Sequence, residues 1–416
     1  MKRGRKKHND YVKEDRLSDL PNCVLLRILS LLDADEAVKT CTISSRWRHL
    51  WKHLPTLILC SSHFMRIKSF NRFVSRILCL RDVSTPLHAV DFLCRGVVDP
   101  RLLKKVVTYA VSHNVEKLRV HACCDFQHFS SCFFSCHTLT SLDLCVGPPR
   151  TDERLSFPKS LNLPALTTLS LESFAFCVGD DGCAEPFSAL NSLKNLMILY
   201  CNVLDAESLC ISSVTLTNLT IVGDPVYYST VELSTPSLFT FDFVCYEGIP
   251  VLKLCRSKIN LSSVKHVNIE VRMWTDYADA SLVLLNWLAE LANIKSLTLN
   301  HTALKVLSLV PDLLKVEFHS LCNLKLLKVK MRIPSSMPNG TLYFLLQNSP
   351  SAKVEIVDWR YYIDFCCPYG ANWEISKKQY QSNEVLNQTF VRTHYALVFM
   401  YKHSCAGILE ALADVF

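Results

Sequence analysis

The chain has 416 residues, of which 49% are hydrophobic and 20% are charged, and its formal net charge is +7. This length exceeds one ordinary core, so we expect several domains or a repeat array, and the composition excludes a disordered chain. Residues 1–16 alone carry seven Lys or Arg and three Asp or Glu. The rest of the chain is therefore close to neutral, which argues against a large nucleic-acid-binding face.

The first segment, KRGRKKH at residues 2–8, is strongly basic. We expect residues 1–14 to form a disordered arm, either a nuclear-import signal or a merely solvated terminus. A secreted protein would be expected to open on an apolar signal segment, and no apolar run here reaches the length of a membrane span. We therefore expect a protein of the nucleus or cytoplasm, without a membrane partner.

The 20 cysteines are expected to be mostly buried thiols, because the expected compartment is reducing. The densest group lies between residues 121 and 137 and contains His121, Cys123, Cys124, His128, Cys132, Cys136 and His137. Zinc sites commonly pair their ligands as C-x-x-C, and this group has no such pair. The spacing favours core and loop positions, and we predict no metal ligands.

Residues 15–54 are patterned as three short helices. In the first, the apolar residues Val24, Leu25, Ile28, Leu29 and Leu32 occupy one broad face. The second begins near residues 33–35, where either of two aspartates can act as N-cap, and the third begins near the serines at 44 and 45.

The third helix, SSRWRHLWKHLP at residues 44–55, interleaves tryptophan with basic residues. Such a segment could bind nucleic acid, lie on a membrane or bury one apolar stripe. The apolar residues of this helix are spaced i, i+3, i+4 and i+7 and so form a single stripe, which consists of Trp47, Leu50, Trp51 and Leu54. The basic residues lie on the opposite side of the helix. Three helices of this size bury little core by themselves, which indicates a partner surface.

Residues 60–114 are interpreted as a linker and N-terminal cap, with helices at 69–82 and 99–114 around a strand at 87–94. A phrase with apolar residues at its first, fourth and sixth positions then recurs nine times, at 115–120, 139–144, 166–171, 193–198, 216–221, 238–243, 264–269, 294–299 and 324–329. This period is typical of leucine-rich repeats, in which each copy supplies one strand of a curved parallel sheet.

The repeats are predicted to span residues 115–357, with a helix and a last strand around 353–357 at their end. Cys201 occupies the turn position where such repeats carry Asn or Cys, and the uneven period suggests variable connections on the convex side. Residues 358–416 lose the repeat; only a terminal helix at 405–416 is suggested there. The fold class is therefore α/β, three helices followed by an irregular leucine-rich-repeat solenoid.

Residues 15–59 resemble an F-box, as found in the large plant class of F-box/leucine-rich-repeat proteins. The matching features are Asp15–Arg16, Leu20–Pro21, ILSLL at 28–32, Ala37–Val38 and SSRWRHLW followed by Pro55. Two further stretches are similar to segments of that class, namely LLKKVVTYAVSHNVEKLRV (102–120) and LYFLLQNSPSAKVEIV (342–357). The segment that leads into the second helix departs from the class, and the FBD pattern of many relatives is not visible after residue 358.

The resemblance implies a substrate-recognition subunit of a Skp–cullin–F-box ubiquitin ligase, with no chemistry of its own. The F-box would bind the Skp adaptor, and through it the cullin, while the repeats hold an unknown protein substrate. The implied adaptor contacts are Leu20, Pro21, Leu25, Ile28, Leu29, Leu32, Val38, Trp47, Leu50 and Trp51. Some of these residues could equally stabilise the helical unit itself.

Alternate strand residues are the candidates for substrate contact, because they face away from the core. They are Arg119, His121, Asp143, Ser170, Glu172, Asn195, Met197, Thr220, Asp242, Asn268, Glu270, Thr298, Asn300 and Lys328. Their mixed polar character favours a protein partner, and no cofactor is predicted.

Three alternatives to a ligase subunit are an enzyme, a nucleic-acid-binding protein and an interaction scaffold. An enzyme is disfavoured because the sequence contains none of the motifs G-x-S-x-G, H-E-x-x-H, G-x-x-x-x-G-K-[ST] or G-x-G-x-x-G. A nucleic-acid-binding protein is disfavoured by the near-neutral body. A scaffold that carries an F-box but assembles no ligase stays open.

Overall fold

The structure is a computed structural model that describes residues 20–124, 135–147, 154–158, 161–179, 182–223, 228–246, 248–254, 263–272, 278–291, 293–316, 321–332 and 338–358. The expected basic arm, Asp15–Arg16 and residues 359–416 lie outside these ranges. So do His128 and Cys132 of the Cys/His group.

The three helices expected near the N-terminus are present. They are α1 (Asn22–Leu29), α2 (Ala34–Lys39), which continues into a short 3-10 turn, and the 3-10 helix η2 (Trp47–His53). Asp33 occupies the N-cap position of α2. Two acidic residues in the first turn interact favourably with the positive end of the helix dipole. The predicted stripe on the third helix is confirmed, since Trp47, Leu50, Trp51 and Leu54 are all buried.

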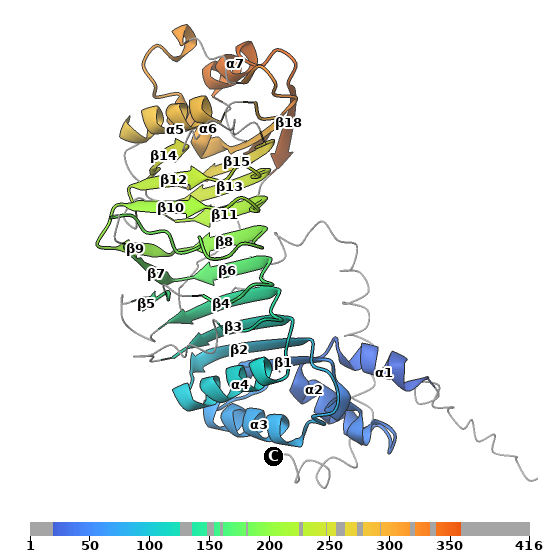
Figure 1. Ribbon diagram of the computed structural model, residues 1–416. Coiled ribbons are helices and arrows are strands. Elements are labelled where there is room, and N and C mark those ends of the chain that lie inside the picture. Colours follow the sequence, from blue (N-terminus) through green and yellow to red (C-terminus); the bar gives the residue numbers. More distant parts are fainter. Residues whose placement is uncertain are drawn as a thin grey trace, which may run out of the picture.

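A 12-stranded sheet forms the body of the molecule (Figure 1). All of its neighbouring strands pair in parallel. In sheet order they are β1 (Thr56–Cys60), β2 (Ala89–Val97), β3 (Lys117–Cys123), β4 (Ser141–Gly147), β6 (Thr168–Glu172), β8 (Asn195–Leu199), β11 (Asn218–Val222), β13 (Thr240–Cys245), β15 (His266–Val271), β16 (Ser296–Asn300), β17 (Leu326–Met331) and β18 (Lys353–Asp358). The nine repeats identified in the sequence supply β3, β4, β6, β8, β11, β13, β15, β16 and β17, so the repeat prediction is confirmed.

The sheet begins earlier than expected. β1 directly follows η2 and pairs with β2, so residues 56–59, at the end of the segment that resembles an F-box, already belong to the sheet. The helices α3 (Ile67–Leu80) and α4 (Pro100–Ser112) flank β2 in sequence, as predicted for the cap. Asp99 caps α4 by accepting a hydrogen bond from the backbone N–H of Arg101.

The opposite layer of the solenoid varies along its length (Figure 1). Its middle part consists of two three-stranded sheets, built from β5 (Leu155–Ser156), β7 (Phe174–Cys177) and β9 (Asn202–Leu204), and from β10 (Ser208–Ser212), β12 (Thr230–Ser234) and β14 (Val251–Leu254). Further on, helices α5 (Ala278–Glu290), α6 (His301–Leu307) and α7 (Asn339–Gln347) take this place. The described helices include none long and apolar enough to span a membrane.

The core lies between these two layers. Strand residues alternate between buried and partly exposed positions, so each repeat buries its Leu, Val, Ile or Phe side chains against its neighbours. Trp287 of α5 packs against the rings of Phe241 and Phe243, and its indole N–H donates to the carbonyl of Pro250 at 2.8 Å. The only polar group of the Trp287 side chain therefore has a hydrogen-bond partner inside the apolar core.

Buried cysteines hydrogen-bond the backbone where the chain leaves the sheet. The Sγ of Cys201 accepts from the N–H of Phe174 at 3.4 Å and lies 3.6 Å from the carbonyl of Leu171. Cys124 similarly contacts the carbonyl of Val98 at 3.3 Å. Burial raises the pKa of Cys201 to about 12, so this thiol stays protonated and able to donate.

Cys183 and Cys210 are exceptions to the expectation that most cysteines are thiols, because they form a disulfide with a Cα–Cα distance of 6.4 Å. They are 27 residues apart, about one repeat, so stacking of successive repeats brings them together. Periodicity alone does not reveal this pairing, because neither residue belongs to the repeated phrase.

Candidate functional site

Helix α1 has two apolar faces. Leu25 and Leu29 are fully buried, whereas Val24 is 40% exposed and Leu31, in the turn that follows the helix, is 39% exposed. Pro21 is also exposed, and Ile28 is half-buried. Because Pro21, Val24, Ile28 and Leu31 are spaced three or four residues apart, they form one surface strip, called here the exposed strip.

The predicted adaptor contacts divide between core and surface. Leu25, Leu29, Val38, Trp47, Leu50 and Trp51 are buried. Leu20, Pro21, Ile28 and Leu32 remain partly or fully exposed. Val24, Leu31 and Ile43 expose large apolar side chains and were missed as surface candidates. Helical spacing alone does not reveal this division, because adjacent residues such as Val24 and Leu25 lie on one broad apolar face.

Helix α1 is held in place by η2. The guanidinium of Arg46 donates to the Oδ1 of Asn22 at 2.9 and 3.2 Å, which joins the start of η2 to the start of α1. The buried leucines of α1 share a core with Trp47. Since a helix of eight residues is not stable alone, the exposed strip depends on this packing.

A small charged cluster joins α2 to the cap of the repeats. The Nδ1 of His63 lies 3.2 Å from a carboxylate oxygen of Asp35 and 3.9 Å from one of Asp33. Asp35 also accepts a hydrogen bond from Lys39 at 3.0 Å. Asp33, Asp35 and His63 offer three potential ligand atoms within 4.8 Å of one another. Because Lys39 already pairs with Asp35, these atoms are explained as an ion-pair cluster.

Replacing Asp33 with asparagine is expected to flatten the dependence of stability on pH. Burial, together with the carboxylates of Glu36 and Asp35, raises the pKa of Asp33 from 3.8 to about 6. A raised pKa favours the folded state below pH 3.8, and this contribution is lost as the pH rises through about 6. We expect Asp33→Asn to exceed the wild type in free energy of unfolding at pH 7.5 by about 1 kcal/mol, after allowance for partial exposure.

Urea denaturation at pH 4 and pH 7.5 measures this difference. The advantage of Asp33→Asn should nearly vanish at pH 4. An equal advantage at both pH values would show that ionisation of Asp33 is not the cause.

The second candidate surface is the side of the 12-stranded sheet that faces away from the core, called here the open face. At its N-terminal end Arg119 is held between two carboxylates, Asp91 at 2.9 Å and Asp143 at 3.1 Å. The Nε2 of His121 lies 3.0 Å from Asp143. Burial raises the pKa of the neighbouring Glu172. This end of the face therefore presents fixed, mutually paired charges.

The middle of the open face carries no charged strand residue over β8 and β11. Asn195 donates its side-chain amide to Thr168 and accepts from Asn218, at 3.2 and 2.7 Å. Met197 is partly exposed, while Thr220 beside it is only 8% exposed. Ser170, Asn268 and Thr298 occupy the same row on other strands.

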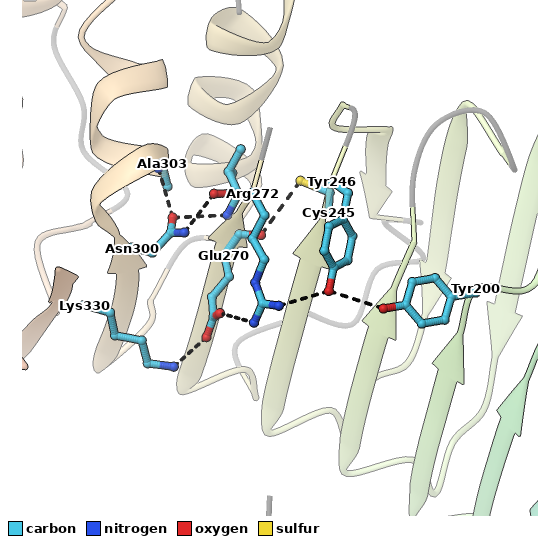
Figure 2. Close-up of polar contacts among 9 residues, drawn as sticks. Tyr200, Cys245, Tyr246, Glu270, Arg272, Asn300, Ala303 and Lys330 are labelled. Carbon is cyan, nitrogen blue, oxygen red and sulfur yellow. Dashed lines mark hydrogen bonds and ion pairs between the residues drawn. The ribbon is translucent and has the colours of Figure 1, made fainter. Parts of the chain in front are cut away.

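A chain of polar contacts crosses the C-terminal part of the open face (Figure 2). The hydroxyl of Tyr200 donates to that of Tyr246 at 3.2 Å, and Arg272 donates to Tyr246 at 3.0 Å. Arg272 also pairs with Glu270 at 3.2 Å, and Glu270 with Lys330 at 2.6 Å. These five residues lie on or directly after β8, β13, β15 and β17. They tie together repeats that are distant in sequence.

The charged residues in and beside this series of polar contacts shift one another's pKa values. Burial alone would raise the pKa of Glu270, but the cations of Lys330 and Arg272 outweigh it and hold that pKa below its usual value. Burial raises the pKa of Asp242, which lies one strand away. Lys328 pairs with Glu355 of β18 at 3.3 Å.

The expectation that Asn300 contacts a substrate is wrong. Its side chain is 1% exposed, accepts hydrogen bonds from the N–H groups of Val271 and Ala303, and donates to the carbonyl of Val271. It thereby caps α6, which begins at the next residue. Glu270 does reach the open face but is covered, with 4% of its surface exposed.

The fold and these surfaces define a class of protein: a leucine-rich-repeat solenoid that carries a small helical docking unit at its N-terminus. Residues 17–59 match the F-box domain. The chain is 30% identical over 259 residues to an F-box/LRR-repeat protein of Arabidopsis thaliana, covering 60% of this chain and 80% of the relative. It is 27% identical to a putative F-box protein of the same plant, covering 83% and 74%, and 28% identical to an F-box/FBD/LRR-repeat protein, covering 60% and 56%.

The chain therefore belongs to the plant F-box/LRR-repeat proteins. The resemblance inferred from Leu20–Pro21 and SSRWRHLW is confirmed by these matches.

Proposed function

We propose that this protein is the substrate-recognition subunit of a Skp–cullin–F-box ubiquitin ligase. The observation that carries the proposal is that the segment matching the F-box domain leaves an apolar strip on its surface. Exposed apolar residues that lie together on one helix are typical of protein-binding surfaces. In this proposal the strip binds the Skp adaptor and the open face holds the substrate, while transfer of ubiquitin takes place on other subunits.

The proposal separates the ten implied adaptor contacts into two roles. Residues of the exposed strip touch the adaptor, together with Leu20, Leu32 and the missed Ile43. The six buried residues act indirectly, by holding the helical unit together: Leu25, Leu29, Val38, Trp47, Leu50 and Trp51.

Val24→Asp/Ile28→Asp is expected to weaken adaptor binding at least about tenfold, because two buried contacts are replaced by charges at the interface. The matched control is Met65→Asp/Val83→Asp, which adds the same charges at positions that are 102% and 72% exposed. Binding of the purified Skp adaptor to each full-length variant measures the effect. Thermal unfolding checks that both variants stay folded.

Full adaptor affinity in Val24→Asp/Ile28→Asp would contradict the assignment of the strip. Co-purification of the wild type with adaptor and cullin tests the ligase itself. Adaptor binding without the cullin would favour a scaffold that assembles no ligase.

A further inference from the structure

One edge of the large sheet carries a row of lysines. Lys265, Lys295 and Lys325 immediately precede β15, β16 and β17, and Lys353 begins β18. Their backbone groups are hydrogen-bonded in series. The N–H of Lys295 donates to the carbonyl of Lys265 at 2.8 Å, that of Lys325 to Lys295 at 2.9 Å, and that of Lys353 to Lys325 at 2.9 Å. The row is therefore rigidly spaced at about the 4.8 Å separation of neighbouring strands.

Phe239 continues the row on the other side of Lys265. It precedes β13, and its carbonyl accepts from the N–H of Lys265 at 3.0 Å. Its side chain is 47% exposed and contacts the ring of His266 edge to face, at 4.9 Å between centroids. We call Phe239, Lys265, Lys295, Lys325 and Lys353 the lysine edge.

The sign of the charge changes along the sheet. The charges compared here are those of each strand together with the one residue that precedes it. The eight strands from β1 to β13 carry four basic and five acidic residues, a net charge of −1. β15 to β18 carry six lysines and three acidic residues, a net charge of +3. Positive charge is thus concentrated on the C-terminal third of the sheet.

Two of the three acidic residues of this third pair with lysines outside the lysine edge, and the third, Asp358, lies at the opposite end of β18 from Lys353. Glu270 and Glu355 lie on the open face, where they pair with Lys330 and Lys328. The residues two positions before each member of the edge are neutral: Ser237, Ser263, Asn293, Asn323 and Ser351.

Three lysines of the edge are open to solvent. Lys295, Lys325 and Lys353 are exposed, and among the described residues no carboxylate pairs with any of them. Like charges held at strand spacing repel one another and raise the local positive potential. An anionic partner would relieve this repulsion.

We infer that the lysine edge docks an acidic segment of the protein substrate, with one apolar residue of that segment packed against Phe239. This inference rests on the proposed function and names the chemistry of its substrate. Exposed aromatic residues beside complementary charge are typical anchors of protein interfaces. Charge complementarity of this kind mainly sets the association rate and the selectivity.

An acidic protein fits the edge better than a nucleic acid does. Phosphate recognition favours arginine, whose fork binds oxygens in pairs, and every cation of the edge is a lysine. Single-stranded nucleic acids also stack successive bases on several aromatic side chains, whereas Phe239 is the one aromatic member of the edge and strands β15 to β18 carry no Phe, Tyr or Trp. Arg272, which directly follows β15, is engaged by Glu270 and Tyr246.

Binding of short fluorescent peptides to the full-length chain tests the inference. One peptide places a Leu among Asp and Glu residues, a second replaces the acids with Asn and Gln, and a third replaces only the Leu with Ser. We expect the acidic Leu peptide to bind most tightly at low ionic strength, and salt to weaken it. Lys295→Glu/Lys325→Glu/Lys353→Glu is expected to weaken this peptide about tenfold.

The matched control, Lys68→Glu/Lys104→Glu/Lys305→Glu, makes the same change of charge at exposed lysines of α3, α4 and α6. Its affinity should stay within about twofold of the wild type. Phe239→Ser should remove the preference for Leu over Ser in the peptide. An equal loss in both triple variants, or no loss in the lysine-edge variant, overturns the inference. So does oligothymidine that binds the wild type more tightly than the acidic peptide.

Adaptor binding, measured on the same variants, separates this inference from the proposed function. The lysine-edge variant should keep full adaptor affinity, because its substitutions lie at the far end of the sheet from α1 (Figure 1). Peptide binding by a chain that does not bind the adaptor would leave the lysine edge standing and remove the ligase proposal.

Discussion

Trp47→Ala is expected to abolish adaptor binding and to lower the free energy of unfolding of the N-terminal unit by about 3–5 kcal/mol. Trp47 is 1% exposed and is one of the largest fully buried side chains, and it belongs to a unit made of only three short helices. Removing it leaves a cavity that a unit of this size cannot refill. Helix α1 then loses the support of η2, and the exposed strip is lost with it.

Trp287→Ala provides the matched control, because Trp287 is equally buried but belongs to α5, far along the solenoid. It should cost a comparable free energy and retain adaptor binding, since repeats are stabilised mainly by their nearest neighbours. Hydrogen exchange resolved by segment distinguishes the two variants. We expect faster exchange in residues 20–54 for Trp47→Ala and in residues 238–291 for Trp287→Ala. Retained adaptor affinity in Trp47→Ala would show that α1 does not need η2.

The large sheet could be predicted because each repeat restates the same physical requirement. A copy such as LTSLDL or IKSLTL cannot bury its leucines alone, so nine copies at a near-constant period specify both the strands and their order. β1 escaped prediction because Thr56–Cys60 lies at the end of the F-box segment and belongs to no repeat of the expected period. The strands of the opposite layer are short and come from the variable connections, where no pattern recurs.

The candidate surfaces could be predicted only in part. Helical spacing places Val24 and Leu25 on a common broad face, but only the position of η2 decides that Leu25 points inward. Strand alternation places Asn300 on the open face, yet its strand ends there and its side chain turns to cap α6. Tyr200, Tyr246 and Arg272 each follow the last residue of a strand, so alternation within strands could not find them.

The chain of contacts in Figure 2 makes the C-terminal part of the open face sensitive to single substitutions. Glu270→Gln is expected to lower the free energy of unfolding by about 3 kcal/mol. The carboxylate is 5% exposed, and its removal leaves the cations of Lys330 and Arg272 near one another without their common counter-charge. The estimate is at the low end of the usual range because each cation is 20% exposed.

Glu355→Gln is the matched control, since Glu355 also pairs with a lysine of the open face but is 52% exposed. An exposed pair contributes about 0–1 kcal/mol, so this variant should stay close to the wild type in urea denaturation. A loss in Glu355→Gln as large as that in Glu270→Gln would show that burial of the pair is not what matters.

The dependence of stability on pH shows whether the ionised carboxylate of Glu270 is the cause of the loss in Glu270→Gln. The folded pKa of Glu270 lies below its ordinary value of 4.5. Its contribution to stability is therefore fully present above pH 4.5 and is lost as the pH falls through the lower folded value. Glu270→Gln cannot lose this contribution, so the gap between variant and wild type should be constant from pH 7 to pH 5 and should narrow below pH 4.5. A gap that persists unchanged into acid would mean that Glu270 acts through its shape and hydrogen bonds, and the charge coupling across β15 and β17 would have to be abandoned.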